Sequence, residues 1–168
     1  MPVFRLVTAF GCVVLSLPLL LAPGSAGASA LVAVADIGFT DSSGEAGDQR
    51  AVHEDRRRGL TEGVRADIGR EGSLESLPLP CEAACRLDAE GVEVLRQRAR
   101  QAGAGFLLVG SVHKMSTLIL SLRVAVLDAD TGKLVFERLL SFRGDNDEGW
   151  RHAGDYVARE VAEQLPAQ

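Results

Sequence analysis

Residues 88–112, DAEGVEVLRQRARQAGAGFLLVGSV, predict a helix that leads directly into a buried strand. Asp88 is a good N-cap residue, and Gly103 is a good residue to end the helix. One face of this helix is apolar, with its residues spaced three, four and three apart: Val92, Leu95, Ala99 and Ala102. The run at residues 106–112 is apolar on both sides, which is typical of a central strand.

The segments upstream predict two more strands and another helix. Residues 31–39 form an apolar run broken only by Asp36, and we expect a strand covered on both faces. A polar loop separates this strand from a helix over residues 51–68, where apolar residues follow helical spacing. Residues 73–79 alternate weakly and predict a short edge strand that prolines end.

The segments downstream predict a strand pair and a final helix. Residues 118–127 alternate between an apolar and a mixed face, and residues 134–142 form the next strand. The turn sequence DADTGK at residues 128–133 joins them. Asp145, with Glu148 three residues later, resembles a capping box at the start of the last helix. The apolar face of the first strand consists of Leu118, Leu120, Leu122, Val124 and Val126.

The predicted element order is strand, helix, strand, helix, strand, strand, strand and helix. A βα unit followed by hairpins implies a mixed sheet, because helical crossovers connect parallel strands and tight turns connect antiparallel ones. We therefore predict an α/β (α+β) fold, in which a mixed sheet of about five strands is covered by about three helices. Residues 31–168 have the length of a single globular domain.

The first thirty residues predict a cleavable secretory signal peptide. Arg5 is the only charge in this segment, and it precedes an apolar run over residues 6–21. Two overlapping Ala-x-Ala cleavage sites follow, at Ala26/Ala28 and Ala28/Ala30. The alternative is a permanent membrane anchor, which two prolines and the small-residue tail disfavour. We expect an exported, periplasmic protein with no membrane span after cleavage.

The composition of the chain excludes several classes of protein. Of the 168 residues, 46% are hydrophobic and 24% are charged, which is ordinary for a globular protein. The formal net charge of -5 argues against a nucleic-acid partner, because binding to phosphates requires a basic surface. Aromatic residues make up 5%, which argues against a stacking platform for bases or sugars.

Three segments form a pattern that covers much of the chain: VAVADI at residues 32–37, GAGFLLVGS at residues 103–111 and VLDADTGK at residues 126–133. This pattern resembles the amino-terminal domain of the TolB translocation protein and the related core of the curli-secretion protein CsgG. More narrowly, GSVHKMSTLIL at residues 110–120 resembles an uncharacterised family of secreted alphaproteobacterial proteins, a domain of unknown function. The resemblance implies a helix-covered sheet and an envelope location, without an established activity. The chain has no room for the β-propeller of TolB or the membrane-inserting hairpins of CsgG, so their roles do not carry over.

Cys81 and Cys85 are the two cysteines that remain after signal cleavage, and in an oxidising compartment we expect them to form a disulfide. Their spacing suits a turn that brings the Cα atoms within about 6 Å. One alternative is a pair of redox-active thiols, which usually show a C-x-x-C motif. The other is a metal site, for which a nearby His or second Cys pair is lacking.

A charged run at residues 53–58, HEDRRR, has two interpretations. It is usually a solvated helix face, here with an i,i+4 pair between Glu54 and Arg58, unless the helix begins after the run. Helical projection, however, places His53 and Arg56 on the apolar side of the helix, where they would point into a cleft. The sequence leaves both interpretations open.

Asp36 and the loop after it are candidates for a ligand or partner surface. Asp36 lies near the carboxyl end of its strand, where α/β sheets place ligand crevices. Asp41 and Ser42 on the following loop could line the same pocket. Alternatively, Asp36 caps a backbone turn or pairs with an arginine such as Arg123 or Arg138.

Motifs of the common enzyme classes are absent from the sequence. The chain has no G-x-S-x-G, no H-E-x-x-H and no nucleotide-binding loop. His113 and His152 have no metal-ligand spacing, and residues 114–117 (KMST) are interpreted as a tight connection between two strands. We expect neither a cofactor nor a metal.

The leading functional hypothesis is a non-enzymatic periplasmic accessory or interaction protein, whose partner is another envelope protein. Its interaction surface would be an exposed strand edge or the loops around Asp41 and His113. One alternative is a small-ligand-binding module, for an organic acid or a metal, that uses Asp36 and Arg56. The other alternative is a thiol-disulfide or hydrolytic enzyme.

Overall fold

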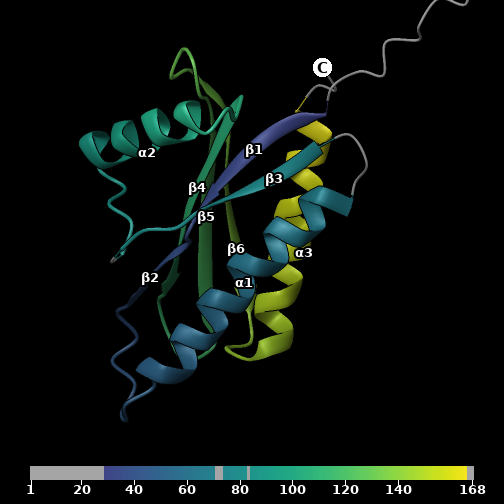
Figure 1. The fold of residues 1–168 in the computed structure, drawn as a ribbon. Helices are drawn as coiled ribbons and strands as arrows, with labels where there is room; N and C mark the ends of the chain where they lie inside the picture. Colours follow the sequence, from purple (N-terminus) through teal and green to yellow (C-terminus); the bar gives the residue numbers. More distant parts are fainter. Residues whose placement is uncertain (1–28, 71–73, 83, 166–168) are drawn as a thin grey trace, which may run out of the picture.

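The computed structural model describes residues 29–70, 74–82 and 84–165, which form six strands in one mixed sheet and three helices (Figure 1). The predicted fold class is confirmed, and so is the element order, except that two strands precede the first helix where one was expected. In chain order the elements are β1 Ala30–Ala35, β2 Gly38–Asp41, α1 Arg50–Arg70, β3 Leu74–Leu79, α2 Ala89–Gln101, β4 Phe106–Lys114, β5 Ile119–Asp128, β6 Leu134–Arg143 and α3 Asp147–Gln164.

The strands lie in the order β3-β1-β4-β5-β6 across the sheet, and β2 pairs with β4 beyond the end of β1. The helical crossovers α1 and α2 lead into the parallel strands β3 and β4, whereas short turns join the antiparallel β4, β5 and β6. The strand predicted over residues 31–39 is divided in two, because the chain leaves the sheet at Asp36 and Ile37.

Helices cover both faces of the sheet: α1 and α3 lie side by side on one face, and α2 lies on the other (Figure 1). The larger core lies under α1 and α3 and includes Leu108, Leu122 and Trp150. The smaller core lies under α2 and includes Leu95 and Leu107. Successive residues of β4 therefore point into different cores, which explains why this strand is apolar on both sides.

The predicted N-cap of α2 is confirmed, whereas the C-cap residue is Ala102, one residue before the predicted Gly103. Asp88 Oδ1 accepts a hydrogen bond from Gly91 N at 2.8 Å, which satisfies one free donor of the first turn. Gly103 follows the helix with a φ of 81°, in the left-handed region that glycine adopts without strain.

The predicted capping box of α3 is wrong. Asn146 is the N-cap residue, and its Oδ1 atom accepts a hydrogen bond from Gly149 N at 2.9 Å. Asp145 lies one residue too early for this role, and its side chain turns into the protein instead. Glu148 is exposed and makes no contact with the cap.

The predicted apolar face of β5 is confirmed except at its first position. The four residues from Leu120 to Val126 that were assigned to this face are buried, in alternation with more exposed neighbours. Leu118 is 67% exposed, because β5 begins at Ile119 and Leu118 lies in the preceding turn.

The charged run lies within α1, which begins at Arg50 and therefore includes the whole run. Glu54 pairs with Arg57 three residues later, so the predicted pair with Arg58 is wrong. His53 is only 2% exposed, which contradicts the solvated interpretation at this position and confirms the inward one.

Residues 1–28, which make up most of the predicted signal peptide, lie outside the described residues. Within the described ranges, none of the helices combines the length and apolar character that crossing a membrane requires.

Candidate functional site

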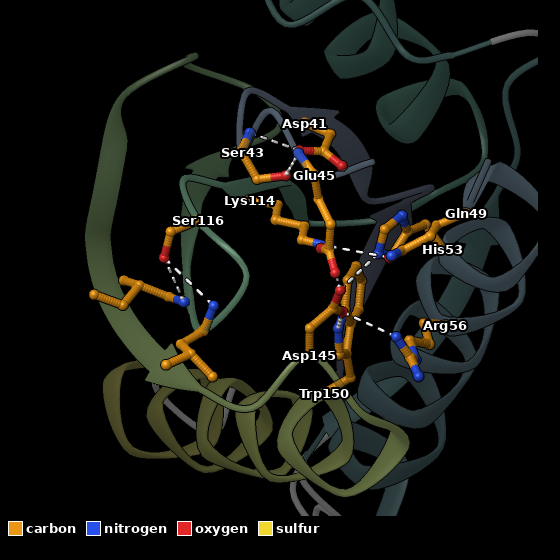
Figure 2. Close-up of polar contacts among 12 residues, drawn as sticks. Asp41, Ser43, Glu45, Gln49, His53, Arg56, Lys114, Ser116, Asp145 and Trp150 are labelled. Atoms are coloured by element: carbon orange, nitrogen blue, oxygen red, sulfur yellow. Dashed lines mark hydrogen bonds and ion pairs between the residues drawn. The ribbon is translucent and has the colours of Figure 1, made fainter. Parts of the chain in front are cut away.

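A buried ion cluster lies at one end of the sheet, around the last residue of β4 (Figure 2). The Nζ atom of Lys114 is 2.6 Å from Glu45 Oε2, 2.7 Å from Asp145 Oδ2 and 3.1 Å from Gln49 Oε1. The Lys114 side chain is fully buried. Because an ammonium group has three hydrogens, these contacts use its whole hydrogen-bonding capacity.

Asp145 is the central acceptor of this cluster. Its Oδ2 atom is 2.7 Å from Lys114 Nζ and 2.8 Å from His53 Nε2. Its Oδ1 atom accepts hydrogen bonds from Arg56 at 3.0 Å and from the Trp150 indole at 3.1 Å. We call the following residues the Lys114 cluster: Glu45, Gln49, His53, Arg56, Lys114, Asp145 and Trp150.

The Lys114 cluster joins segments that are far apart in the sequence. The loop between β2 and α1, the first turns of α1, the end of β4 and the connection between β6 and α3 all contribute side chains (Figure 2). The main chain adds a further link, since Ser42 N donates a hydrogen bond to Lys114 O at 2.9 Å. These contacts connect one end of the sheet to α1 and α3.

The cluster shifts the pKa values of its charged members. Burial alone raises the pKa of the Asp145 carboxyl, but hydrogen bonds from Lys114 and His53 lower it by more, to well below its ordinary 3.8. Burial alone lowers the pKa of Lys114, but hydrogen bonds to Asp145 and Glu45 raise it above its ordinary 10.5. Asp145 and Lys114 are therefore both charged at neutral pH.

This arrangement serves structure better than catalysis. A general base or nucleophile needs a lone pair that a substrate can reach. The Lys114 ammonium and both Asp145 oxygens are already occupied by other members of the cluster. Across the described residues, no three His, Cys, Asp or Glu side chains are grouped closely enough to hold a metal ion.

The lowered pKa of Asp145 predicts a specific dependence of stability on pH. The Asp145 charge stabilises the fold above about pH 4, and this contribution is lost as the pH falls toward the folded-state pKa. We expect the difference in unfolding free energy between the wild type and Asp145→Asn to narrow below pH 4, by up to about 1.4 kcal/mol per pH unit. Urea titrations from neutral pH down to about pH 3 measure this difference, and a constant value would contradict the prediction.

The alternation of side chains along β4 indicates that Lys114 points into the core, which its interpretation as part of a turn does not predict. The expectation that Lys114 belongs to a tight connection is wrong, because β4 continues through it. Lys114 lies two residues after Val112, so both side chains point to the same, core-facing side of the sheet. A lysine at such a position requires buried partners of opposite charge.

The turn between β4 and β5 exposes three large apolar side chains. Leu118 is 67% exposed, Met115 43% and Ile119 40%, and we call these three residues the apolar tip. Met115 N donates a hydrogen bond to Ile119 O at 3.0 Å, and Ile119 N donates one to Ser116 Oγ at 3.2 Å. Lys114 directly precedes the turn, so the Lys114 cluster anchors the apolar tip.

Three residues of the predicted partner surface lie at the same end of the sheet as the apolar tip. His113 Nε2 is 2.6 Å from Ser42 Oγ, which links β4 to the loop after β2. Asp41 is the register partner of Lys114, at the end of both strands. The predicted loops around Asp41 and His113 therefore belong to one region.

Asp36 pairs with an arginine, as one interpretation of the sequence predicts. Its Oδ1 atom accepts a hydrogen bond from Arg65 at 2.9 Å, and its Oδ2 atom accepts one from Cys81 N at 3.2 Å. Arg123 and Arg138 are the wrong partners, because Arg123 on β5 pairs with Glu137 on β6 and Arg138 on β6 pairs with Glu160 on α3.

A pocket of about 720 Å³ opens beside Asp36, between β2, the start of α1 and the two cysteines. Arg56 does not line it but lines a separate groove of about 460 Å³ between α1 and α3. The structure thus separates Asp36 from Arg56, which the ligand-binding alternative places together. The acidic residues that line the larger pocket are Asp36, Asp41, Glu45, Asp48, Glu54 and Glu82.

Cys81 and Cys85 form the predicted disulfide, with their Cα atoms 5.5 Å apart. Both residues pack against the smaller core under α2. The disulfide closes a loop of only a few residues and therefore constrains a local turn.

Because this loop is short, replacing both cysteines with serine is expected to have a modest effect. Closing so few residues removes little chain entropy from the unfolded state, so we expect a loss of about 2 kcal/mol in unfolding free energy. Urea denaturation of Cys81→Ser/Cys85→Ser measures the loss. Failure of this variant to fold would show that the disulfide has a larger role.

Comparison with solved structures places the fold among bacterial proteins. PelC from Paraburkholderia phytofirmans, solved as a dodecamer, is similar at 14% identity with a TM-score of 0.54, over 83% of this chain and 90% of that chain. TolB from Acinetobacter baumannii is similar at 17% identity with a TM-score of 0.47, over 80% of this chain and 28% of TolB. The LpoB C-terminal domain from Salmonella enterica is similar at 15% identity with a TM-score of 0.45, over 71% of this chain and 86% of that domain. These likenesses concern the fold alone.

Sequence comparison assigns the family. No curated protein matches the chain. The model of the DUF3280 family, described as "Protein of unknown function (DUF2380)", matches residues 30–161, a range that includes every strand and most of α3. The chain therefore belongs to the DUF3280 family.

Proposed function

We propose that the protein is a non-enzymatic periplasmic accessory protein that binds another envelope protein through the apolar tip. The observation that carries this proposal is the exposure of Met115 and Leu118 in the turn between β4 and β5 and of Ile119 at the start of β5. Apolar side chains that gather on a protein surface mark sites of interaction with other molecules. His113 and Ser42 lie at the same end of the sheet and supply polar groups beside them.

The rigidity of the turn supports this proposal. Ser116 Oγ accepts hydrogen bonds within the turn, and the buried Lys114 holds its base. A turn that is already ordered loses little conformational entropy when a partner binds, so more of the contact energy appears as affinity. The saturated hydrogen bonding of Lys114 and Asp145 supports a non-enzymatic role.

The proposed location requires export of the chain. We also propose that the signal peptide is cleaved after Ala28. Ala30 is buried in β1 and pairs in register with Leu74. Cleavage after Ala30 would remove this residue from the strand, whereas cleavage after Ala28 leaves β1 intact. The intact mass of the protein recovered from the periplasm tests this step, and a mature chain that begins at Leu31 would contradict it.

Photo-crosslinking from the apolar tip tests the proposed interaction. We expect a photoreactive amino acid at Leu118 to give a discrete adduct with one envelope protein in cells. The matched control is Val94 on α2, which is also apolar and is 52% exposed. Adding Ile119→Asp is expected to reduce the adduct about tenfold, because it places a charge in an apolar contact. Identical adducts at both positions, or an adduct that survives Ile119→Asp, would overturn the proposal.

The pocket of about 720 Å³ favours a second candidate function, the binding of a small cationic ligand. Six carboxylates and two arginines, Arg50 and Arg57, line this pocket, and the excess of negative charge disfavours the organic acid that the sequence suggests. A thermal-shift screen with small amines tests this function, since a ligand that binds only the folded state must raise the melting temperature. No shift at saturating concentrations would exclude the amines, and loss of a shift in Glu82→Gln would locate their site.

A further inference from the structure

The outer edge of β6 has no strand partner among the described residues, although the Arg138 side chain donates a hydrogen bond to Glu137 O at 3.1 Å. β6 has ten residues and pairs only with β5 among the described residues. Its side chains include Leu134 and Leu139, which are 57% and 62% exposed. A long edge strand with exposed apolar side chains is a template for pairing with another strand, since its outward N–H and C=O groups have no strand partner.

We propose that β6 pairs antiparallel with β6 of a second copy of this chain, over residues 137–143 of each strand and centred on Leu140. The proposal goes beyond partner binding at the apolar tip, because it uses the main chain of β6 and does not involve Leu118. Pairing of this kind joins the two sheets into one and removes an exposed edge from each copy.

Strand geometry restricts the possible registers. Residues directly opposite each other in an antiparallel pair point to the same face of the sheet. Two copies related by a two-fold axis perpendicular to the sheet keep their equivalent faces on the same side. The axis then passes beside one central residue of β6, which lies opposite itself in the second copy. Every other odd-numbered residue lies opposite an odd-numbered one, and every even-numbered residue lies opposite an even-numbered one.

The charges of β6 select one of these registers. Centring the pair on Glu137 or on Arg138 places that residue opposite the same residue of the second copy. Two like charges would then face each other, which is unfavourable. Centring it on Leu139 gives no charge a partner of opposite sign. Centring it on Leu140 places Glu137 opposite the partner's Arg143 and Arg143 opposite the partner's Glu137, so that two ion pairs form. Arg143 has no ion pair within the described part of the chain, and this register supplies one with Glu137 of the second copy, which also contacts Arg123 of its own chain at 3.0 Å.

The groove beside Leu140 supports the same centre. Leu140, Phe142 and Tyr156 line a groove of about 360 Å³ between β6 and α3. The proposed register places the two Leu140 side chains next to each other at the axis, so the two grooves meet there. Tyr156, which is partly exposed in one copy, would help to cover this joint apolar surface.

Sedimentation equilibrium of the purified protein, with charge reversals in β6, tests the proposal. We expect the wild-type protein to dimerise, and Glu137→Arg or Arg143→Glu alone to weaken the dimer about tenfold or more, because each places like charges opposite each other twice. The double reversal Glu137→Arg/Arg143→Glu restores both ion pairs and is expected to restore the dimer. Arg58→Glu on the exposed face of α1 is the control for a change of net charge.

Hydrogen exchange supplies a second measurement that a simple loss of folding cannot imitate. Amides of residues 137–143 are expected to become more protected as the protein concentration rises, while those of α2 do not change. A wild-type protein that stays monomeric would overturn this inference and leave the proposal for the apolar tip intact. A dimer that tolerates both single reversals, or that the double reversal fails to restore, would also overturn it.

Discussion

Asp145→Ala is expected to lower the unfolding free energy by about 3–5 kcal/mol, the largest effect of any single substitution considered for this chain. Removal of the carboxylate leaves Lys114 buried with one anionic partner fewer and leaves His53 and Trp150 without their acceptor. The cost is high because these groups have been taken out of water and cannot be resolvated without opening the fold. For a chain of this size we expect the melting temperature to fall by roughly 10 °C.

Asp147→Ala provides the matched control for this prediction. Asp147 is two residues further along and also pairs with Arg56, at 2.9 Å, but its side chain is almost fully exposed. An exposed ion pair contributes little, so we expect a loss of less than about 1 kcal/mol. Urea denaturation of both variants measures the contrast. Similar losses for Asp145→Ala and Asp147→Ala would mean that the Lys114 cluster does not stabilise the fold as argued.

Gly149→Ala is expected to cost about 3 kcal/mol, the second largest effect. A Cβ atom at Gly149 would lie close to Gly144 O and 3.1 Å from Arg143 O. Both contacts are with backbone, so neither can be relieved by rotating a side chain. The connection from β6 to α3 would have to move, and this connection also positions Asp145.

Gly59→Ala is the control for Gly149→Ala. Gly59 lies inside α1, and a Cβ atom there would meet nothing within 4 Å. Since alanine is the better helix former, this substitution is expected to raise the unfolding free energy by up to about 1 kcal/mol. Thermal and urea unfolding of both variants test the pair. A Gly149→Ala protein as stable as the wild type would contradict the close approach of the backbone.

Local periodicity is sufficient to predict most of the fold. The apolar stripe of α2 and the alternation of β5 each determine a structure within a short window, and both are present except at one end, where Ala102 and Leu118 are exposed. The errors lie at the ends of elements, such as Leu118 before β5 and Asp145 before α3. There, one residue decides between a strand and a turn, or between a cap and a buried ion pair, and local pattern does not determine which one forms.

Local sequence pattern does not predict the Lys114 cluster, because its members are brought together only by the topology of the sheet. His53 and Asp145 are 92 residues apart in sequence, and their contact requires α1 and the end of β6 to reach the same end of the sheet. Helical projection predicts that His53 points inward, but it does not predict the partner. Asp36 shows the same limit, since a pair with an arginine is one interpretation of a carboxylate in an apolar run and the choice of Arg65 follows from the packing of α1.

The position of β1 between β3 and β4 has a consequence for the order of folding. β1 is the first strand to emerge during synthesis or translocation, yet its register partners on β4 begin at Phe106, 74 residues after Val32. Loop closure over this distance is slow, and until β4 forms β1 has only β3 as a neighbour, so its other edge stays unpaired. A chain that has emerged only as far as α2 therefore exposes one apolar edge of β1 until β4 is available.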